Sequence, residues 1–568
     1  MRPSVRRKRK GPKTSCTCPS PVNARSEKSA FSGRNISRCC ALGSSAFIGR
    51  FENIIVIAHI TAHQPKRITK RDIMTTALRH FRPRFKSFAV IGFCLLTATS
   101  LSACSTNPAT GERQFAGLMS PQQESSVGAQ EHAKVLQTYS ALPANDPLQV
   151  YVDQVGAKIA ANTERPDVQY KFFVLDDPMV NAFALPGGYV YVTRGLLAHA
   201  NSEAELAAVL AHEVGHITGR HSAERYSQGV VTSLGAAVLS AALDSSTASQ
   251  ALGLGSQLYI KSYSRGQEHE ADELGVRYLV RAGYDKSAMA SFLRNLERHG
   301  ALENKLAGRG ESAGVNYFST HPLTADRVAQ TKAIAASYQQ GQAVTNHDGY
   351  LRKIDGIVFG DSAKQGFIRG QSFYHTQMDF MFTVPNGFVI SNQPDKVAAT
   401  NNNGTIILFD AAQRSSGMDA MTYVTQSWMK SEPLDGVEKI SINGKNAATA
   451  SFSATIGGQP SLVRVVAVEW SPNTFYRFQM AMPVNATVGI VEGLKRTTYS
   501  LRPLTGQEKA NIKPHIVKVF NASAGDTAAS LGNRMPFSNF QEERFRVLNG
   551  LDAGVPVQSG TLYKTITE

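Results

Sequence analysis

The residues most able to do chemistry are the two histidines and the glutamate of the segment His212-Glu213-Val214-Gly215-His216. Residues four apart lie on one face of a helix, so the imidazoles of His212 and His216 can bind one metal ion. The carboxylate of Glu213, one residue further round the helix, then points at the next coordination position. Zinc takes about four ligands, and a catalytic site keeps one of them as water. The segment therefore predicts one catalytic zinc ion per chain, with a third protein ligand elsewhere.

That third ligand is expected downstream, where the segment Glu268-His269-Glu270-Ala271-Asp272 offers acidic side chains. Glu268 and Asp272 are again four residues apart and face together on a helix. His269 and Glu270 are interpreted as part of a solvated helix face. The alternative is a chance HExxH, but Ser202 followed by Glu205 predicts a capping box that starts a helix at a suitable distance. The second acidic helix also argues against chance.

Four blocks of the sequence resemble one family of zinc peptidases, the gluzincins related to HtpX and the CaaX prenyl proteases, and most closely their soluble, periplasmic BepA-like branch. In the family's order, the blocks are NAFALPGGYVYVTRGLL from Asn181, LAAVLAHEVGHITGRH from Leu206, YSRGQEHEADELG from Tyr263 and STHPLTADR from Ser319. The resemblance covers about 119–345. It implies the following site residues: His212, His216 and Glu268 as zinc ligands, Glu213 as the catalytic acid/base, Asp272 as the carboxylate that orients a ligand, and His321 and Arg327 as residues that reach the active site from a loop.

The reaction that follows is hydrolysis of a peptide bond. Zinc lowers the pKa of its water and polarises the scissile carbonyl, while Glu213 takes the water's proton and returns it to the leaving amine. By resemblance, Arg327 stabilises the oxyanion, and the alternative for this residue is a surface salt bridge. The strand near Asn181 to Leu185 is expected to pair with an extended substrate backbone, which gives affinity with little sequence specificity.

His321 stands in a Thr-His-Pro turn, on what the resemblance suggests is a mobile loop over the active site. A neutral imidazole is as good a zinc ligand as the two already present. We therefore predict that His321 takes the fourth position in a resting state, displaces the water and silences the enzyme. The alternative is that His321 caps a helix start or hydrogen-bonds its own loop.

Hydrophobic periodicity indicates an α+β fold class, with a mostly helical zincin domain over 119–345 that contains a small sheet. Helices are predicted from Pro121 to Tyr139, from Pro147 to Asn162, after Ser202, over 228–263 and around 268–281. Strands are predicted at Lys171 to Leu175 and Tyr189 to Thr193, the second introduced by the turn Pro186-Gly187-Gly188.

The remaining chain divides into a linker (346–372), a small α+β domain of unknown role (373–505) and a tail (510–568). The α+β domain is predicted to hold strands at 380–384, 404–409, 461–470 and 474–482 and a helix at 488–500. No repeat of about 34 residues indicates tetratricopeptide helices, so the chain departs here from BepA-like proteins. The tail has a strand, helix, helix, strand outline and resembles a LysM module, which implies peptidoglycan binding. The alternative is a structural cap that binds no glycan.

The N-terminal part predicts export. From Met74, a basic start and a short apolar core end at Leu101-Ser102-Ala103-Cys104, which resembles the lipobox of bacterial lipoproteins. Residues 74–103 are thus a predicted signal peptide, and Cys104 is the predicted lipidation site that holds the protein on a membrane. Residues 104–118 form a tether, and residues 1–73 are interpreted as a disordered, mis-assigned upstream extension. Ser105 at the next position favours the outer membrane, and the alternative is a plain secretory signal or an uncleaved anchor.

Composition excludes a nucleic-acid partner in spite of the net charge of +16. Residues 1–103 hold 20 Lys and Arg against 3 Asp and Glu, so the rest of the chain is nearly neutral and lacks the basic patch that nucleic-acid binding needs. The sequence therefore predicts a lipid-anchored zinc endopeptidase of the periplasm that cleaves misfolded or unassembled envelope proteins. One alternative is an outer-membrane assembly chaperone or scaffold with a latent site, and another is a cell-wall binding protein.

Overall fold

The computed structural model describes residues 104–242, 262–306, 321, 326–393 and 395–568, and of residues 233–242 it describes only the backbone. The expected upstream extension, the expected signal peptide and the neighbours of His321 lie outside these residues. Helices and strands both occur along the described chain, which confirms the α+β class. None of the described helices combines the length and the apolar character that crossing a membrane requires.

A small three-stranded sheet, in the order β3-β5-β4, lies beside the helix with the HExxH segment. Strand β3 (Lys171–Leu175) pairs in parallel with β5 (Tyr189–Thr193), and β4 (Ala182–Leu185) pairs antiparallel with β5. Both predicted strands are thus present. The turn into β5 needs its glycines, because Gly188 has a φ of +103° and a Cβ there would lie 2.4 Å from the carbonyl oxygen of Gln169.

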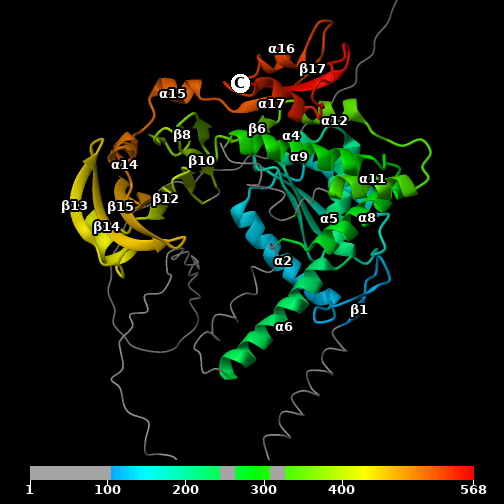
Figure 1. The fold of residues 1–568 in the computed structure, drawn as a ribbon, viewed down its shortest axis with the longest axis horizontal. Coiled ribbons are helices and arrows are strands. Elements are labelled where there is room, and N and C mark those ends of the chain that lie inside the picture. Colours follow the sequence, from blue (N-terminus) through cyan, green and yellow to red (C-terminus); the bar gives the residue numbers. More distant parts are fainter. Residues whose placement is uncertain (1–103, 243–261, 307–320, 322–325, 394) are drawn as a thin grey trace, which may run out of the picture. The chain divides into compact units, whose positions relative to one another are not determined.

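Helix α5 (Glu203–Thr218) carries the HExxH segment through the centre of the main core, and every one of its residues from Ala204 to Thr218 is buried. The helix is therefore surrounded by neighbours on all sides, and its polar side chains are buried with its apolar ones. It packs against α8 (Arg265–Arg281), as Figure 1 shows. The other helices of this part are α2 (Pro121–Thr138), α3 (Pro147–Ala160), α4 (Arg194–His199), α6 (His221–Ala242), α9 (Ala288–Leu306) and α11 (Arg327–Ser337).

The start of α5 differs in detail from the predicted capping box. The Ser202 hydroxyl accepts a hydrogen bond from the backbone N–H of Glu205 at 3.2 Å, as predicted. The Glu205 carboxylate, however, accepts from the N–H of Asn201 at 2.8 Å and from the hydroxyl of Ser291 at 2.7 Å. Only half of the box is present, because Glu205 binds neighbouring groups instead. The next helix, α6, begins at His221 and not at 228.

Residues 104–118, expected to be a tether, lie against the helices. Cys104 is exposed. The following strand β1 (Ser105–Thr106) pairs with β2 (Arg113–Gln114), and the loop between them contacts α8, where Arg277 donates to the Ala109 carbonyl at 2.9 Å. The described segment is therefore a docked hairpin, since its polar loop finds hydrogen-bond partners on the helices.

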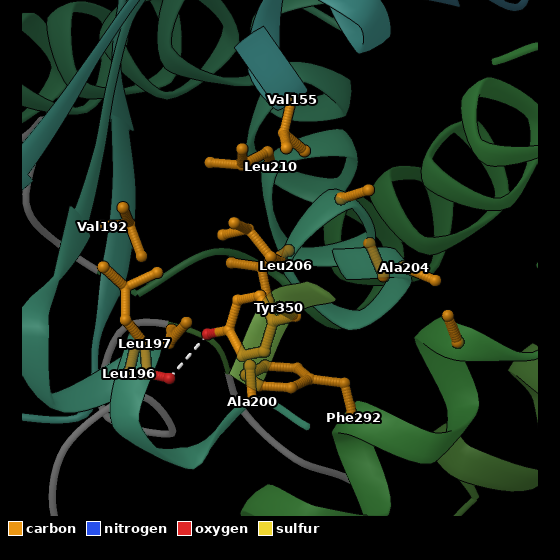
Figure 2. Close-up of a cluster of buried hydrophobic side chains, with 14 of the residues drawn as sticks. Val155, Val192, Leu196, Leu197, Ala200, Ala204, Leu206, Leu210, Phe292 and Tyr350 are labelled. Carbon is orange, nitrogen blue, oxygen red and sulfur yellow. Dashed lines mark hydrogen bonds between the residues drawn. The ribbon is translucent and has the colours of Figure 1, made fainter. Parts of the chain in front are cut away.

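The segment expected as a linker, 346–372, also differs from the prediction. Helix α12 (His347–Ile354) buries Tyr350, Leu351 and Ile354 in the main core. Figure 2 shows the ring of Tyr350 among side chains of α4, α5 and α9, with its hydroxyl donating to the Leu197 carbonyl at 2.6 Å. A flexible linker would leave these apolar groups in water.

Residues 367–500 form β-rich structure with separate cores. A three-stranded sheet holds β7 (Phe367–Arg369), β8 (Ser372–His375) and β9 (Phe380–Thr383). An antiparallel seven-stranded sheet follows, with helix α14 (Val488–Ser500) contributing to the core on one side and α13 (Ala420–Thr422) with a π-helix (Tyr423–Trp428) to the core on the other. Its strand order is β10 (Val389–Asn392), β11 (Val397–Thr400), β12 (Ile406–Gln413), β16 (Thr474–Pro483), β15 (Gln459–Ser471), β14 (Lys445–Ile456) and β13 (Asp435–Ile442).

The four predicted strands and the predicted helix of this part are present, but strands such as β13 and β14 were not predicted. Strand β13 is largely exposed at the edge of the sheet, and β14 is rich in Ala, Ser and Thr, so neither has a strong apolar run. Strand β14 is fixed by its pairing with β15, and β13 by its pairing with β14, and this tertiary pairing has no local sequence signal.

The tail has the predicted order of elements: β17 (His515–Asn521), α16 (Ala528–Gly532), α17 (Gln541–Leu548) and β18 (Leu562–Thr567), reached through α15 (Gly506–Asn511). Strand β17 pairs with β18 and with the short strand β6 (Val358–Phe359). Val517, Phe545 and Ile566 are buried in the same hydrophobic cluster as α5. The tail thus shares its core with the helices that carry the HExxH segment.

Candidate metal centre

The three expected ligand residues come together between α5 and α8. His212 and His216 are each 1% exposed and Glu268 is 2% exposed. Glycines allow the two helices to approach this closely, because a Cβ at Gly215 would lie 3.1 Å from the Ala271 carbonyl oxygen and one at Gly275 would lie 3.3 Å from the backbone nitrogen of His212.

His321 joins this group as a fourth side chain that could hold a metal ion. The Nε2 atoms of His212 and His216 lie 3.1 Å apart, and Nδ1 of His321 lies 3.3 Å from the first of them. The Glu268 carboxylate oxygens lie 3.0 Å from His321 Nδ1, 3.4 Å from His216 Nε2 and 3.6 Å from His212 Nε2. One ligand atom from each of these four residues lies within 4.8 Å of the others.

The spacing of these ligand atoms fits zinc. Zinc–nitrogen and zinc–oxygen bonds of about 2.0–2.1 Å place tetrahedral ligand atoms about 3.3–3.4 Å apart. The five separations above run from 3.0 to 3.6 Å. Two or three imidazoles with one carboxylate are also a donor set that zinc prefers. The residues present therefore fit a zinc ion.

Glu213 is fully buried beside this group. Neither of its carboxylate oxygens accepts a hydrogen bond within the described part of the chain, and Nε2 of His321 lies 3.4 Å from one of them. Burial raises the pKa of Glu213, against the opposing effect of His321 and His212. A buried carboxylate with a raised pKa is suited to exchanging a proton near neutral pH.

Asp272 and Arg327 contact the expected ligand residues His212 and Glu268. Asp272 Oδ1 lies 2.9 Å from Nδ1 of His212, which leaves Nε2 to face the metal position. The Arg327 guanidinium donates to both oxygens of Asp272 at 2.6 and 2.8 Å and pairs with Glu268 at 2.7 Å. Arg327 is 3% exposed, so the alternative of a surface salt bridge is wrong.

The charges of the group favour the metal-binding forms of Glu268 and His216 but the protonated form of His212. Burial opposes ionisation of Glu268, but His321 and the hydrogen-bonded histidines hold its pKa well below the ordinary value. Burial lowers the pKa of His216 well below its ordinary value. For His212, burial is outweighed by the carboxylates of Asp272 and Glu268, which raise its pKa to about 9. Metal binding would therefore release a proton from His212, because a ligand histidine must be neutral.

Three further residues around His216 had no predicted role. Tyr263 stacks on its ring with centroids 3.6 Å apart. His221 Nδ1 lies 2.7 Å from His216 Nδ1, and His221 Nε2 lies 3.5 Å from the Glu270 carboxylate. Glu270, interpreted above as solvated, is partly buried and accepts a hydrogen bond from Asn107. His221 could have been found from its position five residues after His216. The contact of Glu270 with Asn107 spans 163 residues, so no local sequence pattern indicates it.

The edge of the small sheet lies near the same group. Strand β4 packs on α5 and pairs on one side with β5, and no strand of the described chain pairs with its other side. Ala184 of β4 and the ligand His216 line one small cavity together with Tyr263. The geometry thus brings the expected substrate strand beside the candidate metal position.

Comparison with known proteins gives a match of residues 147–335 to the family model described as Peptidase family M48. A putative beta-barrel assembly-enhancing protease of Vibrio cholerae is 33% identical over 245 residues, which are 40% of this chain and 48% of that protein. The Beta-barrel assembly-enhancing protease of Escherichia coli K12 is 30% identical over 224 residues, 38% of this chain and 44% of that protein. The Mitochondrial metalloendopeptidase OMA1 of Arabidopsis thaliana is 35% identical over 164 residues, 29% of this chain and 31% of that protein.

The chain thus spans less than half the length of the curated relatives named here. Within the matched segment lie the HExxH helix, the Glu268 helix, His321 and Arg327. A metalloendopeptidase is among the relatives that this chain matches. Residues 147–335 are therefore a peptidase family M48 domain, the gluzincin family that the sequence resembles.

Proposed function

We propose that this chain is a zinc-dependent metalloendopeptidase. The observation that supports it best is the buried group of His212, His216, Glu268 and His321, whose ligand separations fit zinc. A carboxylate with no hydrogen bond from the described residues, that of Glu213, lies at its edge. This combination of metal ligands with an adjacent proton acceptor is what hydrolysis of a peptide bond requires.

Each residue then has one role. When bound, zinc supplies a Lewis acid for the scissile carbonyl and lowers the pKa of a coordinated water. Glu213 takes the proton of that water and passes it to the leaving amine. Asp272 holds His212 in the tautomer that presents Nε2 to the metal, and Arg327 holds Asp272 and Glu268 in place. Stabilisation of the oxyanion by Arg327 stays a prediction.

We further propose that His321 holds the fourth position in the resting enzyme. Its Nδ1 lies within 3.3 Å of both His212 and Glu268, and its ring is fully buried among the ligands. An imidazole there leaves no place for the water, so catalysis needs His321 to withdraw. The alternative, that His321 only caps a helix start or bonds its own loop, does not account for these contacts with ligand residues.

For the substrate, we propose misfolded or unassembled proteins of the bacterial envelope. Two relatives carry names that refer to the assembly of beta-barrels. The open edge of β4 supports recognition of an extended backbone, which would accept many sequences. We also propose that the protein is periplasmic and that Cys104 carries lipid that attaches it to the outer membrane. Residues 510–568 would contact peptidoglycan.

The test is to measure zinc content and casein cleavage for the wild type and Glu213→Gln. Glu213→Gln keeps all ligands, so it should bind one zinc per chain and lose its proteolysis. The matched control is Glu273→Gln on α8, whose carboxylate is 46% exposed and pairs with Arg277. Equal cleavage by wild type and Glu213→Gln would reject this mechanism. Zinc binding without any proteolysis in both the wild type and His321→Ala would favour the scaffold alternative.

A further inference from the structure

We propose that the N-terminal hairpin, residues 105–114, is part of the metal centre, because Asn107 positions the zinc ligand His216 through Glu270 and His221. This inference rests on the proposed zinc site. It assigns a positioning role to Asn107, Glu270 and His221, which lie on three separate segments and are joined side chain to side chain.

The first step is the contact between the two histidines. His221 is fully buried, and its Nδ1 lies 2.7 Å from Nδ1 of His216. A His216 that binds zinc through Nε2 carries its hydrogen on Nδ1 and donates it to Nδ1 of His221. His221 then carries its own hydrogen on Nε2, which faces the Glu270 carboxylate 3.5 Å away. The metal at one end and the Glu270 carboxylate at the other thus decide which ring nitrogen of each histidine carries the hydrogen.

The backbone before His221 is shaped to turn its ring toward His216. Arg220 has a φ of 55°, in the left-handed region that residues other than glycine rarely adopt. Gly219 leaves room for the ring, because a Cβ there would lie 2.6 Å from Nε2 of His221. Arg220 is held in this conformation by Glu124 at 2.9 Å and by the Met119 carbonyl at 2.5 Å. Backbone strain that is held in this way marks a position with a specific task.

The second step joins Glu270 to the hairpin. Asn107 is 2% exposed and donates from Nδ2 to the Glu270 carboxylate. Its side-chain oxygen accepts from the backbone N–H of Ala109 at 2.9 Å and of Thr110 at 3.3 Å, so the tight loop fixes its orientation. Asn107 therefore holds the carboxylate that fixes His221, and it stands three residues after the proposed lipid-bearing Cys104.

The experiment measures zinc affinity of the full chain by competition with a chelator, together with the visible absorption of the cobalt-substituted protein. Cobalt absorption reports the geometry of the ligands and is independent of proteolysis. His221→Leu keeps the bulk but removes the hydrogen bond with His216 and the polar contact with Glu270. His221→Gln can still accept from His216 and donate to Glu270. His269→Leu, at an exposed position of α8, is the control.

His221→Leu should weaken zinc binding about 10- to 100-fold and alter the cobalt spectrum, as loss of groups behind a metal ligand typically does. His221→Gln should restore most of the affinity, and His269→Leu should match the wild type. A His221→Leu protein with wild-type affinity and spectrum would overturn the role of His221, as would a His221→Gln protein no better than His221→Leu.

The hairpin is tested with Asn107→Asp, which keeps the two loop hydrogen bonds but replaces the donor to Glu270 with a second carboxylate. We expect weaker zinc binding, and no additional loss when Asn107→Asp is combined with His221→Leu, because both act through the same contact. Unchanged affinity in Asn107→Asp, or losses that simply add, would refute the link to the hairpin. Wild-type and His321→Ala proteins that both bind zinc but cleave nothing would refute the proposed function and leave this test valid.

Discussion

Lys564 offers the sharpest test of how the C-terminal tail supports the catalytic helices. It lies on β18, is fully buried, and its ammonium donates to the carbonyls of Ala198 and Ala200 at 2.8 and 2.7 Å. These carbonyls end helix α4, where no backbone N–H of the same helix can reach them. Lys564→Met keeps most of the side-chain volume and removes the donor.

The expected loss of stability follows from these contacts. Each carbonyl left without a donor costs about 1–3 kcal/mol, and removal of a buried ammonium returns part of its desolvation cost. Glu205, the acidic neighbour of Lys564, keeps its bonds from Asn201 and Ser291. We therefore expect Lys564→Met to lower the free energy of unfolding by about 2–4 kcal/mol. Urea unfolding followed by far-ultraviolet circular dichroism measures it.

The matched control is Lys518→Met on the neighbouring strand β17. The Lys518 ammonium pairs with Asp355 at 3.0 Å, but its side chain is 53% exposed. A surface ion pair of this kind contributes about 0–1 kcal/mol. If Lys564→Met costs no more than Lys518→Met, the tail does not support α4 in the way that we infer.

The pH dependence of the free energy of unfolding is a second test of Lys564. Burial lowers the pKa of Lys564 in the folded protein, whereas an unfolded lysine keeps its proton up to a pH of about 10.4. At pH values between the lowered pKa of folded Lys564 and the pKa of the unfolded lysine, the unfolded chain binds more protons than the folded protein. This group therefore makes the free energy of unfolding rise with pH. The difference between wild type and Lys564→Met should therefore widen as the pH increases toward 10. A difference that narrows over this range contradicts the argument.

Three further outcomes are expected. His321→Ala should keep its zinc and cleave casein and itself faster than wild type, and activity that falls or stays level would leave His321 as a structural or substrate-contacting residue. Asp272→Asn should weaken zinc binding about 10- to 100-fold in a chelator competition, because it disturbs both His212 and Arg327, and unchanged affinity would remove its proposed role. Cys104→Ser should move the protein from the membrane to the soluble periplasmic fraction, and failure of a fatty-acid analogue to label wild-type protein would reject lipidation.

The clustering of His212, His216 and Glu268 could be predicted from sequence because their signals are local. His212 and His216 share a helix face, and Glu268 lies in a short block with its own spacing. The strands at 171–175 and 189–193 and the helix at 488–500 were found for the same reason, since each has its own apolar pattern.

What could not be predicted depends on contacts between distant segments. The bonds from Lys564 to α4 span more than 360 residues, and the bond from Asn107 to Glu270 spans 163. The residue type does not show whether a lysine in a strand is buried or exposed, so only the fold distinguishes Lys564 from Lys518. The same holds for Glu270, which was interpreted as solvated because its partner lies in the N-terminal hairpin.

The burial of the centre bears on how such a site can work. His212, His216 and Glu268 are at most 2% exposed, and Glu213 and His321 are fully buried. A peptide bond and a water molecule both need to reach the atoms that these side chains surround. The imidazole of His321 lies between Glu213 and Glu268, 3.4 and 3.0 Å from their oxygens, and so fills the space where the water would have to stand. The described arrangement is therefore a closed one, and our proposal requires His321 to leave while the contacts of Asp272 with His212 and of His221 with His216 hold the expected ligands in place.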